Sequence, residues 1–332
     1  MSESRVVIEQ IFLLLAVGII GYIAGKTKYL PANSDKVIAA LVVKITAPLM
    51  IVTKMYNMEF DSRDYLNGVK LYFFAIVFVL MGYGISLIFR KICKITGDTS
   101  RIFSMQMMFG NVIYFAIPLI AVLSEQLPEM WGKGAAYAMF FVLGNDTVMW
   151  TLGISLVQKN DGRKSVKDKF KHLINANSIA FIIGMILILI GAKSLLSQNH
   201  IVSIFVNKMS DVGSMTAHLS MLFVGIMLAN IKLGSVVKDI KRKYPLIIAS
   251  MVKLVLLPLM AVILLKLLGE FLPIEPAKVL VLQLAMPGAT IVAALAGQYD
   301  SDAEFATEGI FISTLLLVGT LPMVLWISDI IL

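Results

Sequence analysis

The chain alternates long apolar runs with short polar segments, and this pattern occurs ten times along its 332 residues. A helix needs roughly 20 mostly apolar residues to cross the hydrocarbon core of a bilayer. The runs are continuous rather than alternating at every second residue, so we expect helices, which satisfy their own backbone hydrogen bonds in lipid. The predicted spans are Val6–Gly25, Val37–Met55, Leu66–Phe89, Ile102–Leu123, Ala135–Val157, Ala176–Leu196, Met215–Ile231, Pro245–Leu268, Ala277–Tyr299 and Phe305–Leu332.

The composition favours a membrane protein over a soluble one. Hydrophobic residues make up 58% of the chain and charged residues only 15%, whereas soluble domains carry roughly 25% charged residues. A soluble fold must cover its surface with polar side chains and has no place for so much apolar surface. We therefore expect an all-α membrane protein. The stretch His200–Ser214, just before the seventh run, has the pattern of a separate short amphipathic helix at the membrane interface.

The net charge of +8 comes from lysines and arginines in the loops between the apolar runs. Such residues are typical beside anionic lipid headgroups, so we expect contact with membrane lipid and no nucleic-acid binding. The loops on one side hold 18 Lys and Arg residues and those on the other side hold 9. Because basic loops stay in the cytoplasm, the sequence predicts a multi-pass protein of the cytoplasmic (inner) cell membrane with both termini outside.

The largest basic loop, Lys159 to Lys171, lies midway along the chain and divides it into two halves of five spans. We expect a first repeat at 1–157, a cytoplasmic linker at 158–175 and a second repeat at 176–332. An odd number of spans per half gives the repeats opposite orientations. Short matches support this: Thr46-Ala47-Pro48-Leu49 pairs with Thr216-Ala217-His218-Leu219, and Gln106 before Gly110-Asn111 pairs with Gln283 before Pro287-Gly288.

The fourth and ninth spans each carry a glycine, a proline and polar side chains near their middle. In the fourth span these are Gly110, Asn111 and Pro118, and in the ninth they include Pro287 and Gly288. Proline removes an amide donor and clashes with a carbonyl one turn back. The freed backbone groups need partners in lipid, so broken helices at matching places in two inverted halves point to a transporter's binding site. The alternative is a pair of ordinary proline kinks.

At these residues the chain resembles the auxin efflux carrier family, the bacterial relatives of plant PIN-formed carriers. The fourth-span run Asn111-x-x-Tyr114-x-x-x-Pro118 is similar to that family's N-x-G-F-x-G-x-P signature, although Ile113 and Ala116 stand where the motif has glycines. Further agreement comes from the ninth and final spans, with Met286-Pro287 and with Ser313-Thr314-Leu315. The resemblance extends over nearly the whole chain.

The resemblance implies a fold like that of sodium/proton antiporters, in which the broken fourth and ninth helices cross. It implies a scaffold formed by helices 1, 2, 6 and 7, and a transport domain formed by helices 3–5 and 8–10. Elevator-type alternating access goes with this fold, and the cargo would be an organic anion such as a dicarboxylate or an auxin-like weak acid. The candidate substrate residues at the crossing are Gly110, Asn111, Tyr114, Pro118, Gln283, Met286, Pro287 and Gly288.

Charged side chains within the spans are candidates for ion coupling. Asp146, next to Asn145, is the one acidic residue that the sequence places deep in a span. A carboxylate in hydrocarbon is costly unless paired, hydrated or protonated, so it is a functional candidate for carrying protons or sodium; the alternative is a purely structural carboxylate at the crossing. Lys253, roughly 12 Å into the eighth span, could balance Asp146 or attract a substrate carboxylate. The cluster Asp300, Asp302, Glu304 and Glu308 has the pattern of a solvated acidic loop.

Enzyme motifs are not found in the sequence. There is no Gly-x-Ser-x-Gly, His-Glu-x-x-His or Walker pattern, so we expect neither an enzyme nor an ATP-driven pump. One cysteine and three widely spaced histidines give no basis for a disulfide, a metal site or a cofactor. We expect a secondary transporter of a small organic anion. A monovalent cation/proton antiporter and a non-transporting metabolite receptor are the alternatives, and a homodimer is one assembly that the sequence leaves open.

Overall fold

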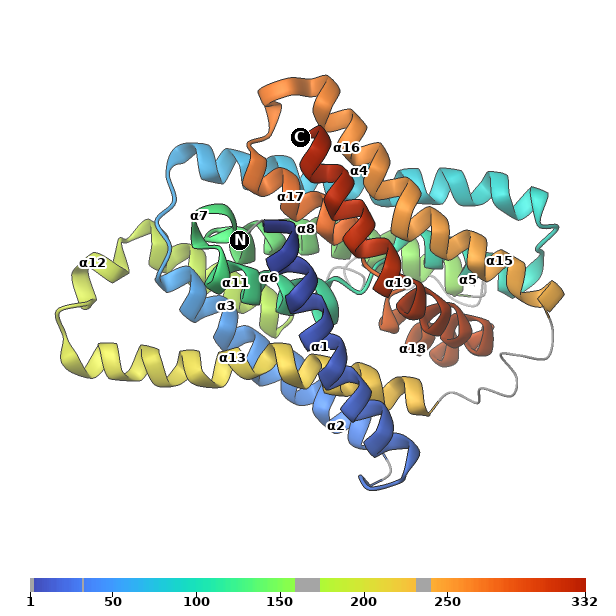
Figure 1. Ribbon diagram of the computed structural model, residues 1–332, viewed down its shortest axis with the longest axis horizontal. Helices are drawn as coiled ribbons and strands as arrows, with labels where there is room; N and C mark the ends of the chain where they lie inside the picture. Colours follow the sequence, from blue (N-terminus) through green and yellow to red (C-terminus); the bar gives the residue numbers. More distant parts are fainter. Residues whose placement is uncertain (1–2, 32, 159–173, 231–239) are drawn as a thin grey trace. The chain divides into compact units, whose positions relative to one another are not determined.

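The computed structural model describes residues 3–31, 33–158, 174–230 and 240–332, and these ranges fold into helices without any strand. The all-α prediction is therefore confirmed for the described part of the chain (Figure 1). The predicted basic linker, 158–175 with Lys159 to Lys171, lies almost wholly outside these ranges.

Six helical stretches of the described residues are long and apolar enough to cross a membrane: Ser34–Tyr56, Ser62–Ile92, Pro128–Val157, His200–Ala229, Lys243–Phe271 and Ala303–Ile331. Shorter apolar helices cover Phe12–Lys26, Val112–Gln126 and Ala176–Leu189. The fourth and ninth predicted spans are each divided into separate helices, α5 (Gly97–Met108) and α6 (Ile117–Gln126), and α17 (Ile274–Leu284) and α18 (Thr290–Gln298).

The chain divides into two compact units. The first unit comprises Met1–Lys70, Ile113–Phe140 and Ile174–Asn230, and the second comprises Leu71–Val112, Phe141–Leu173 and Ile231–Leu332. Helices α4 (Ser62–Ile92) and α8 (Gly134–Val148) begin in the first unit and end in the second. The short elements between the main helices are α2 (Ser34–Leu41), α7 (Pro128–Trp131), α9 (Ile154–Val157), α12 (Ala192–Leu196) and η5 (Gly269–Phe271).

In the first unit, helices α1 (Glu3–Lys26) and α13 (His200–Ala229) pack along each other at very short range. A side chain at Gly225 would collide with the backbone carbonyl of Gly18, and one at Gly21 would collide with that of Leu222. Small residues allow helix backbones to approach closely in membranes, where dispersion contacts rather than the hydrophobic effect hold helices together. The glycines therefore fix how α1 lies on α13.

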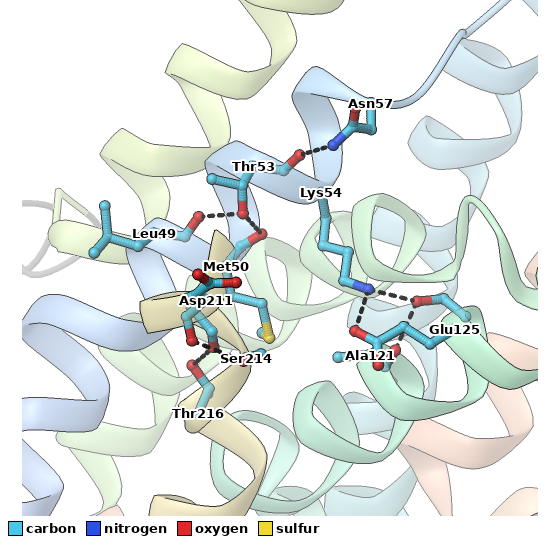
Figure 2. Close-up of polar contacts among 12 residues, drawn as sticks. Leu49, Met50, Thr53, Lys54, Asn57, Ala121, Glu125, Asp211, Ser214 and Thr216 are labelled. Carbon is cyan, nitrogen blue, oxygen red and sulfur yellow. Dashed lines mark hydrogen bonds and ion pairs between the residues drawn. The ribbon is translucent and has the colours of Figure 1, made fainter. Parts of the chain in front are cut away.

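Helix α3 (Ala47–Tyr56) packs against α13, α11 (Ala176–Leu189) and, through a lysine, α6 (Ile117–Gln126). A Cβ at Gly213 of α13 would lie 2.8 Å from the backbone nitrogen of Met50. Figure 2 shows Lys54 of α3 reaching α6, where its ammonium is 2.8 Å from the Glu125 carboxylate. A second ion pair joins Lys133 to Asp64, whose carboxylate also accepts a hydrogen bond from the Tyr137 hydroxyl at 2.6 Å.

The prediction of a separate amphipathic helix before the seventh span is wrong. The residues His200–Ala229 form one continuous helix of 30 residues, capped by Asn199, whose side chain accepts hydrogen bonds from the amides of Ile201 and Val202. No proline interrupts this helix. The glycine next to the expected boundary, Gly213, allows the close approach to Met50. The polar first half and the apolar second half are thus one element.

Prolines two residues beyond a π-helical turn recur in the fold. Such turns are η1 (Val42–Thr46), η2 (Val112–Ala116) and η4 (Val252–Leu256), and the prolines that follow are Pro48, Pro118 and Pro258. Each proline lies in the first turn of the next helix, where its missing amide is least costly. The wider turn before it gives the ring room beside the preceding carbonyl groups. A fourth π-helical turn, η3 (Met149–Gly153), has no such proline.

In the second unit, α19 (Ala303–Ile331) is the central element. It packs along α15 (Ile240–Met251), α16 (Leu257–Leu268) and α18 (Thr290–Gln298), and it also contacts α5 (Gly97–Met108) and α17 (Ile274–Leu284), as Figure 1 illustrates for the long helices. An ion pair of 3.1 Å between Lys278 and Asp329 ties the start of α17 to the end of α19. These helices hold the two interrupted segments described next.

Candidate functional site: two interrupted helices

Both helix interruptions expected from the sequence are present in the second unit. Helix α5 ends at Met108, and Phe109 takes an extended conformation before the chain enters η2 at Val112. Helix α17 ends at Leu284 and α18 begins at Thr290, with Ala289 extended just before it. The first break therefore spans residues 109–111 and the second spans 285–289.

The two breaks are joined to each other by their backbones. The Asn111 amide donates to the Pro287 carbonyl at 2.7 Å, and the Ala289 amide donates to the Phe109 carbonyl at 3.1 Å. Between these bonds, Gly110 and Gly288 form an isolated antiparallel bridge. Backbone groups freed by a helix break need partners inside a membrane, and here each break supplies partners for the other. The structure thus brings together Gly110, Asn111, Pro287 and Gly288.

Lys253 adds a buried cation to this pair of breaks. It lies on η4 with 2% of its surface exposed, and its ammonium donates to the carbonyl oxygen of Met108 at 3.3 Å. A Cβ at Gly110 would be 3.0 Å from the Lys253 Cε and 3.3 Å from its Nζ, so the lysine tip lies against the glycine backbone. Since a helix C-terminus carries partial negative charge, the ammonium is favourably placed at the end of α5.

Side chains of two other helices hold the second break. The Ser313 hydroxyl on α19 accepts a hydrogen bond from the Gly288 amide at 2.9 Å. Gln106 on α5 donates from Nε2 to the Ala306 carbonyl at 2.7 Å, and its Oε1 occupies the space where a side chain at Gly288 would lie. Sequence reasoning did not assign site roles to Gln106 and Ser313. The sequence could have identified Gln106 as a site residue, because it lies one turn before Gly110, just as Gln283 lies one turn before Pro287.

The remaining ninth-span candidates are fully buried near the break. Gln283 lies in the last turn of α17 with 0% exposure, and Met286 follows it within the break. A Cβ at Gly110 would be 3.3 Å from the Met286 Cβ, so Met286 packs against the first break. Met286 therefore lies against the paired backbones, and Gln283 lies in the helical turn directly before the second break.

The remaining fourth-span candidates, Tyr114 and Pro118, belong to the first unit. The Tyr114 ring packs on the Phe223 ring of α13, with 4.6 Å between their centroids. Pro118 lies in the first turn of α6, directly after η2. Tyr114 and Pro118 thus belong to the first unit, whereas the four bridged residues belong to the second.

Asn145 and Asp146 lie on the part of α8 that belongs to the second unit. Asn145 is buried and Asp146 is half-buried, and the Asn145 Nδ2 lies 3.4 Å from the Asp146 Oδ1. Asp146 and Lys253 are both described, and no ion pair joins them. Charge balance between these two residues, one of the options raised by the sequence, would therefore act without direct contact and stays a prediction.

The acidic cluster at the start of α19 is solvated only in part: Asp300 and Glu304 are exposed, as expected. Asp302 caps α19 by accepting from the Phe305 amide, and it also accepts a hydrogen bond from the Thr99 hydroxyl at 2.6 Å. Glu308 is only 4% exposed. The expectation of a solvated acid at Glu308 is wrong, because this residue falls in the second turn of a helix that packs on α5 and α15. The prediction that Asp146 is the one acidic residue deep in an apolar helix is therefore wrong, because Glu308 is buried in α19.

Apolar helices of membrane-spanning length, together with two interrupted helices that satisfy each other in the second unit, define a multi-pass membrane transport protein. A family model described as membrane transport protein matches residues 6–327, and the chain therefore belongs to this family, the auxin efflux carrier family. It is a family of transporters rather than enzymes. Comparison with curated proteins gives no match.

Proposed function

We propose that this protein is a secondary active transporter that carries a small organic anion across the cytoplasmic membrane. The cargo class is a carboxylate such as malate or malonate, or an auxin-like weak acid. The observation that carries the proposal is the buried Lys253 ammonium beside Gly110, at the point where the two breaks pair. There a buried cation lies directly against backbone that has left the helical conformation.

The chemistry of the breaks suits a carboxylate. Helix α18 begins at Thr290, and the first amides of a helix point outward without intrahelical partners. Such an N-terminus carries partial positive charge and binds anions. Together with Lys253, it provides charge and hydrogen-bond donors for an anion near Gly110 and Gly288. Met286 and Gln283 supply buried apolar and amide surface beside it.

We extend the proposal to the architecture of the whole chain. Ten spans would arise as two inverted repeats of five, with both termini outside and the Lys- and Arg-rich loops in the cytoplasm. The two halves of α5–α6 and of α17–α18 count as single broken spans. Helices 1, 2, 6 and 7 form the scaffold, and helices 3–5 and 8–10 carry the cargo by elevator-type alternating access.

Cysteine labelling tests the orientation. In a Cys93→Ser background, Tyr29→Cys lies in a predicted cytoplasmic loop and Glu59→Cys in a predicted outer loop, and both positions are exposed. An impermeant thiol reagent added to intact cells should label the Glu59→Cys protein and leave the Tyr29→Cys protein unlabelled until the membrane is permeabilised. The reverse pattern would overturn the orientation.

The transport activity is tested by counterflow in proteoliposomes. Vesicles preloaded with one unlabelled carboxylate should accumulate the same labelled carboxylate from outside, and vesicles without protein should not. A panel of mono- and dicarboxylates would identify the cargo. Failure of every organic anion in a correctly oriented, folded protein would contradict the proposal.

A monovalent cation/proton antiporter is the second candidate, favoured by the adjacent Asn145 and Asp146 in the second unit. This candidate requires that sodium or potassium gradients move protons, and that carboxylates have no effect. A pH-sensitive dye enclosed in the same vesicles separates the two: cation-driven proton flux without carboxylate counterflow would establish the antiporter.

A further inference from the structure

Gln106 occupies a position between three elements of the second unit. It lies in the last turn of α5, is 4% exposed, and contacts the break before α18 as well as the first turns of α19. Its amide nitrogen donates to the Ala306 carbonyl at 2.7 Å. Its amide oxygen lies against the Cα of Gly288, an arrangement in which a Cα–H group contacts a carbonyl oxygen.

Two glycines make room for this side chain. A Cβ on Gly288 would collide with the Gln106 Oε1, while the next atoms it would meet, the Gln106 Cδ and the Ser313 Oγ, are 3.3 and 3.4 Å away. A Cβ on Gly309 would lie 3.0 Å from both the Cδ and the Nε2 of the same amide. The amide is therefore enclosed between a glycine of the break and a glycine of α19.

The groups that α19 contributes lie along one side of that helix. Ala306 and Ser313 are seven residues apart, which is close to two full helical turns. Ala306 accepts from Gln106, and Ser313 accepts from the Gly288 amide. Gly288 is thus held at its amide by α19 and at its Cα by α5. At the first break, by comparison, backbone groups bond to the second break and Lys253 binds the Met108 carbonyl.

The geometry points to Gln106 as the positioning residue of the second break: its amide ties the end of α5 to α19 and sets where Gly288 pairs with Gly110. This inference rests on the proposed function, because it assigns Gln106 a role in forming the anion site without contact to the anion. Loss of the amide leaves the helices in place but lets the break shift, and a shift of about 1 Å at a binding site is enough to cost about 100-fold in activity.

A double-substitution cycle tests the inference, with counterflow of the carboxylate that the wild type carries best as the assay. Gln106→Ala should raise the apparent KM about 10-fold or more, with a smaller change in maximal rate. Gly288→Ala alone should be more severe, because the added methyl meets the Gln106 oxygen. Gln106→Ala/Gly288→Ala should be no worse than Gln106→Ala, since removing the amide removes the collision.

The matched control is Ser104→Ala. Ser104 lies on the same helix, is 0% exposed and shares a buried hydrogen bond of 2.8 Å with Ser86, away from the breaks. A merely structural role for buried polar groups of α5 predicts similar effects of Ser104→Ala and Gln106→Ala on KM. An unchanged KM in Gln106→Ala, or additive effects of Gln106→Ala and Gly288→Ala, would overturn the inference.

Thermal unfolding of the same four proteins separates this inference from the proposed function. If the wild type carries no carboxylate, the proposed function fails, and the unfolding temperatures alone decide the role of Gln106. A large decrease caused by Gly288→Ala in the wild-type background that disappears in the Gln106→Ala background supports Gln106 as the residue that holds the break. Equal decreases in both backgrounds contradict it.

Discussion

The two helix breaks of the second unit both need hydrogen-bond partners for backbone groups that have left a helix, and they obtain these partners in different ways. The first break, residues 109–111, is short and relies on backbone bonds to the second break and on the lysine at the end of α5. The second break, residues 285–289, is longer and contains Pro287, which has no amide to donate. Its glycine amide is bound by Ser313, and its glycine Cα is covered by Gln106.

This difference shows that two segments with similar glycine and proline patterns need not be held by similar tertiary contacts. The first break is less crowded at its glycine, because a Cβ at Gly110 would lie 3.0 Å from the Lys253 Cε and 3.3 Å from the Met286 Cβ, whereas one at Gly288 would collide with the Gln106 Oε1. The second break is enclosed by short, buried side chains of α5 and α19. We therefore expect the second break to be the more rigid part of the proposed anion site, and the first to be the part that adapts to the cargo.

The largest expected effect comes from adding one methyl group to each break in turn. Gly288→Ala should reduce counterflow by about 100-fold, because the collision with Gln106 displaces the site. Gly110→Ala should reduce it less, since the added methyl would be 3.0 Å from the Lys253 Cε, its nearest neighbour, and needs only a small shift. Initial rates of counterflow at equal protein density measure both. Equal losses would mean that the two breaks are equally rigid.

Asp146 lies in neither break, so changing it separates binding at the breaks from ion coupling. Asp146→Asn should retain carboxylate exchange, because the amide keeps the shape and most hydrogen bonds, and should lose accumulation driven by a proton gradient. Exchange and accumulation are measured in the same vesicles. Unchanged pH dependence of accumulation in the Asp146→Asn protein would exclude this carboxylate as the proton carrier.

Lys253→Met tests the cation of the first break. The substitution keeps an apolar stem, removes the charge, and should raise the apparent KM about 10-fold, in the range for losing one charged hydrogen-bonding group of about 1.5–3 kcal/mol. Lys44→Met is the matched control, because Lys44 also lies on a π-helical turn but is exposed. A similar KM in both variants would show that the buried ammonium does not attract the cargo.

The smallest expected effect is that of Ser313→Ala. It leaves the buried amide of Gly288 without its hydroxyl acceptor, which should cost about 1–3 kcal/mol. The loss should appear as a lower unfolding temperature, with KM changed less than in Gln106→Ala because Gln106 still holds the Cα. A larger rise in KM for Ser313→Ala than for Gln106→Ala would assign the positioning role to the serine instead.

The sequence predicted the features that depend on local chemistry. Gly110, Pro287 and Gly288 identified both breaks, because glycine and proline weaken a helix where they occur together with polar residues at matching places in the two halves. Lys253 stood out because a deep lysine is costly. The π-helical turns before Pro48, Pro118 and Pro258 could not be predicted from the prolines alone, because Pro322 lies within α19 without such a turn.

Features that depend on tertiary packing could not be predicted in this way. The close packing of α13 on α3 places Gly213 against Met50, and the burial of Glu308 depends on which helices surround the first turns of α19. The role of Gln106 arises from Ala306, which is 200 residues away in sequence, and from a glycine on a third element. The spacing of residues within one helix cannot predict contacts between helices that are so far apart in the sequence.

The central claim, that a carboxylate binds where the two breaks pair, is tested most directly by substrate protection. In a Cys93→Ser background, Asn111→Cys places a thiol in the first break. Replacing Cys93 removes a slow background, since burial already raises the pKa of the Cys93 thiol and less thiolate is available to react. The transported carboxylate should slow labelling of Asn111→Cys by a small thiol reagent, with half-protection at a concentration equal to its KM. Labelling that proceeds at the same rate under saturating, transported carboxylate would contradict the account.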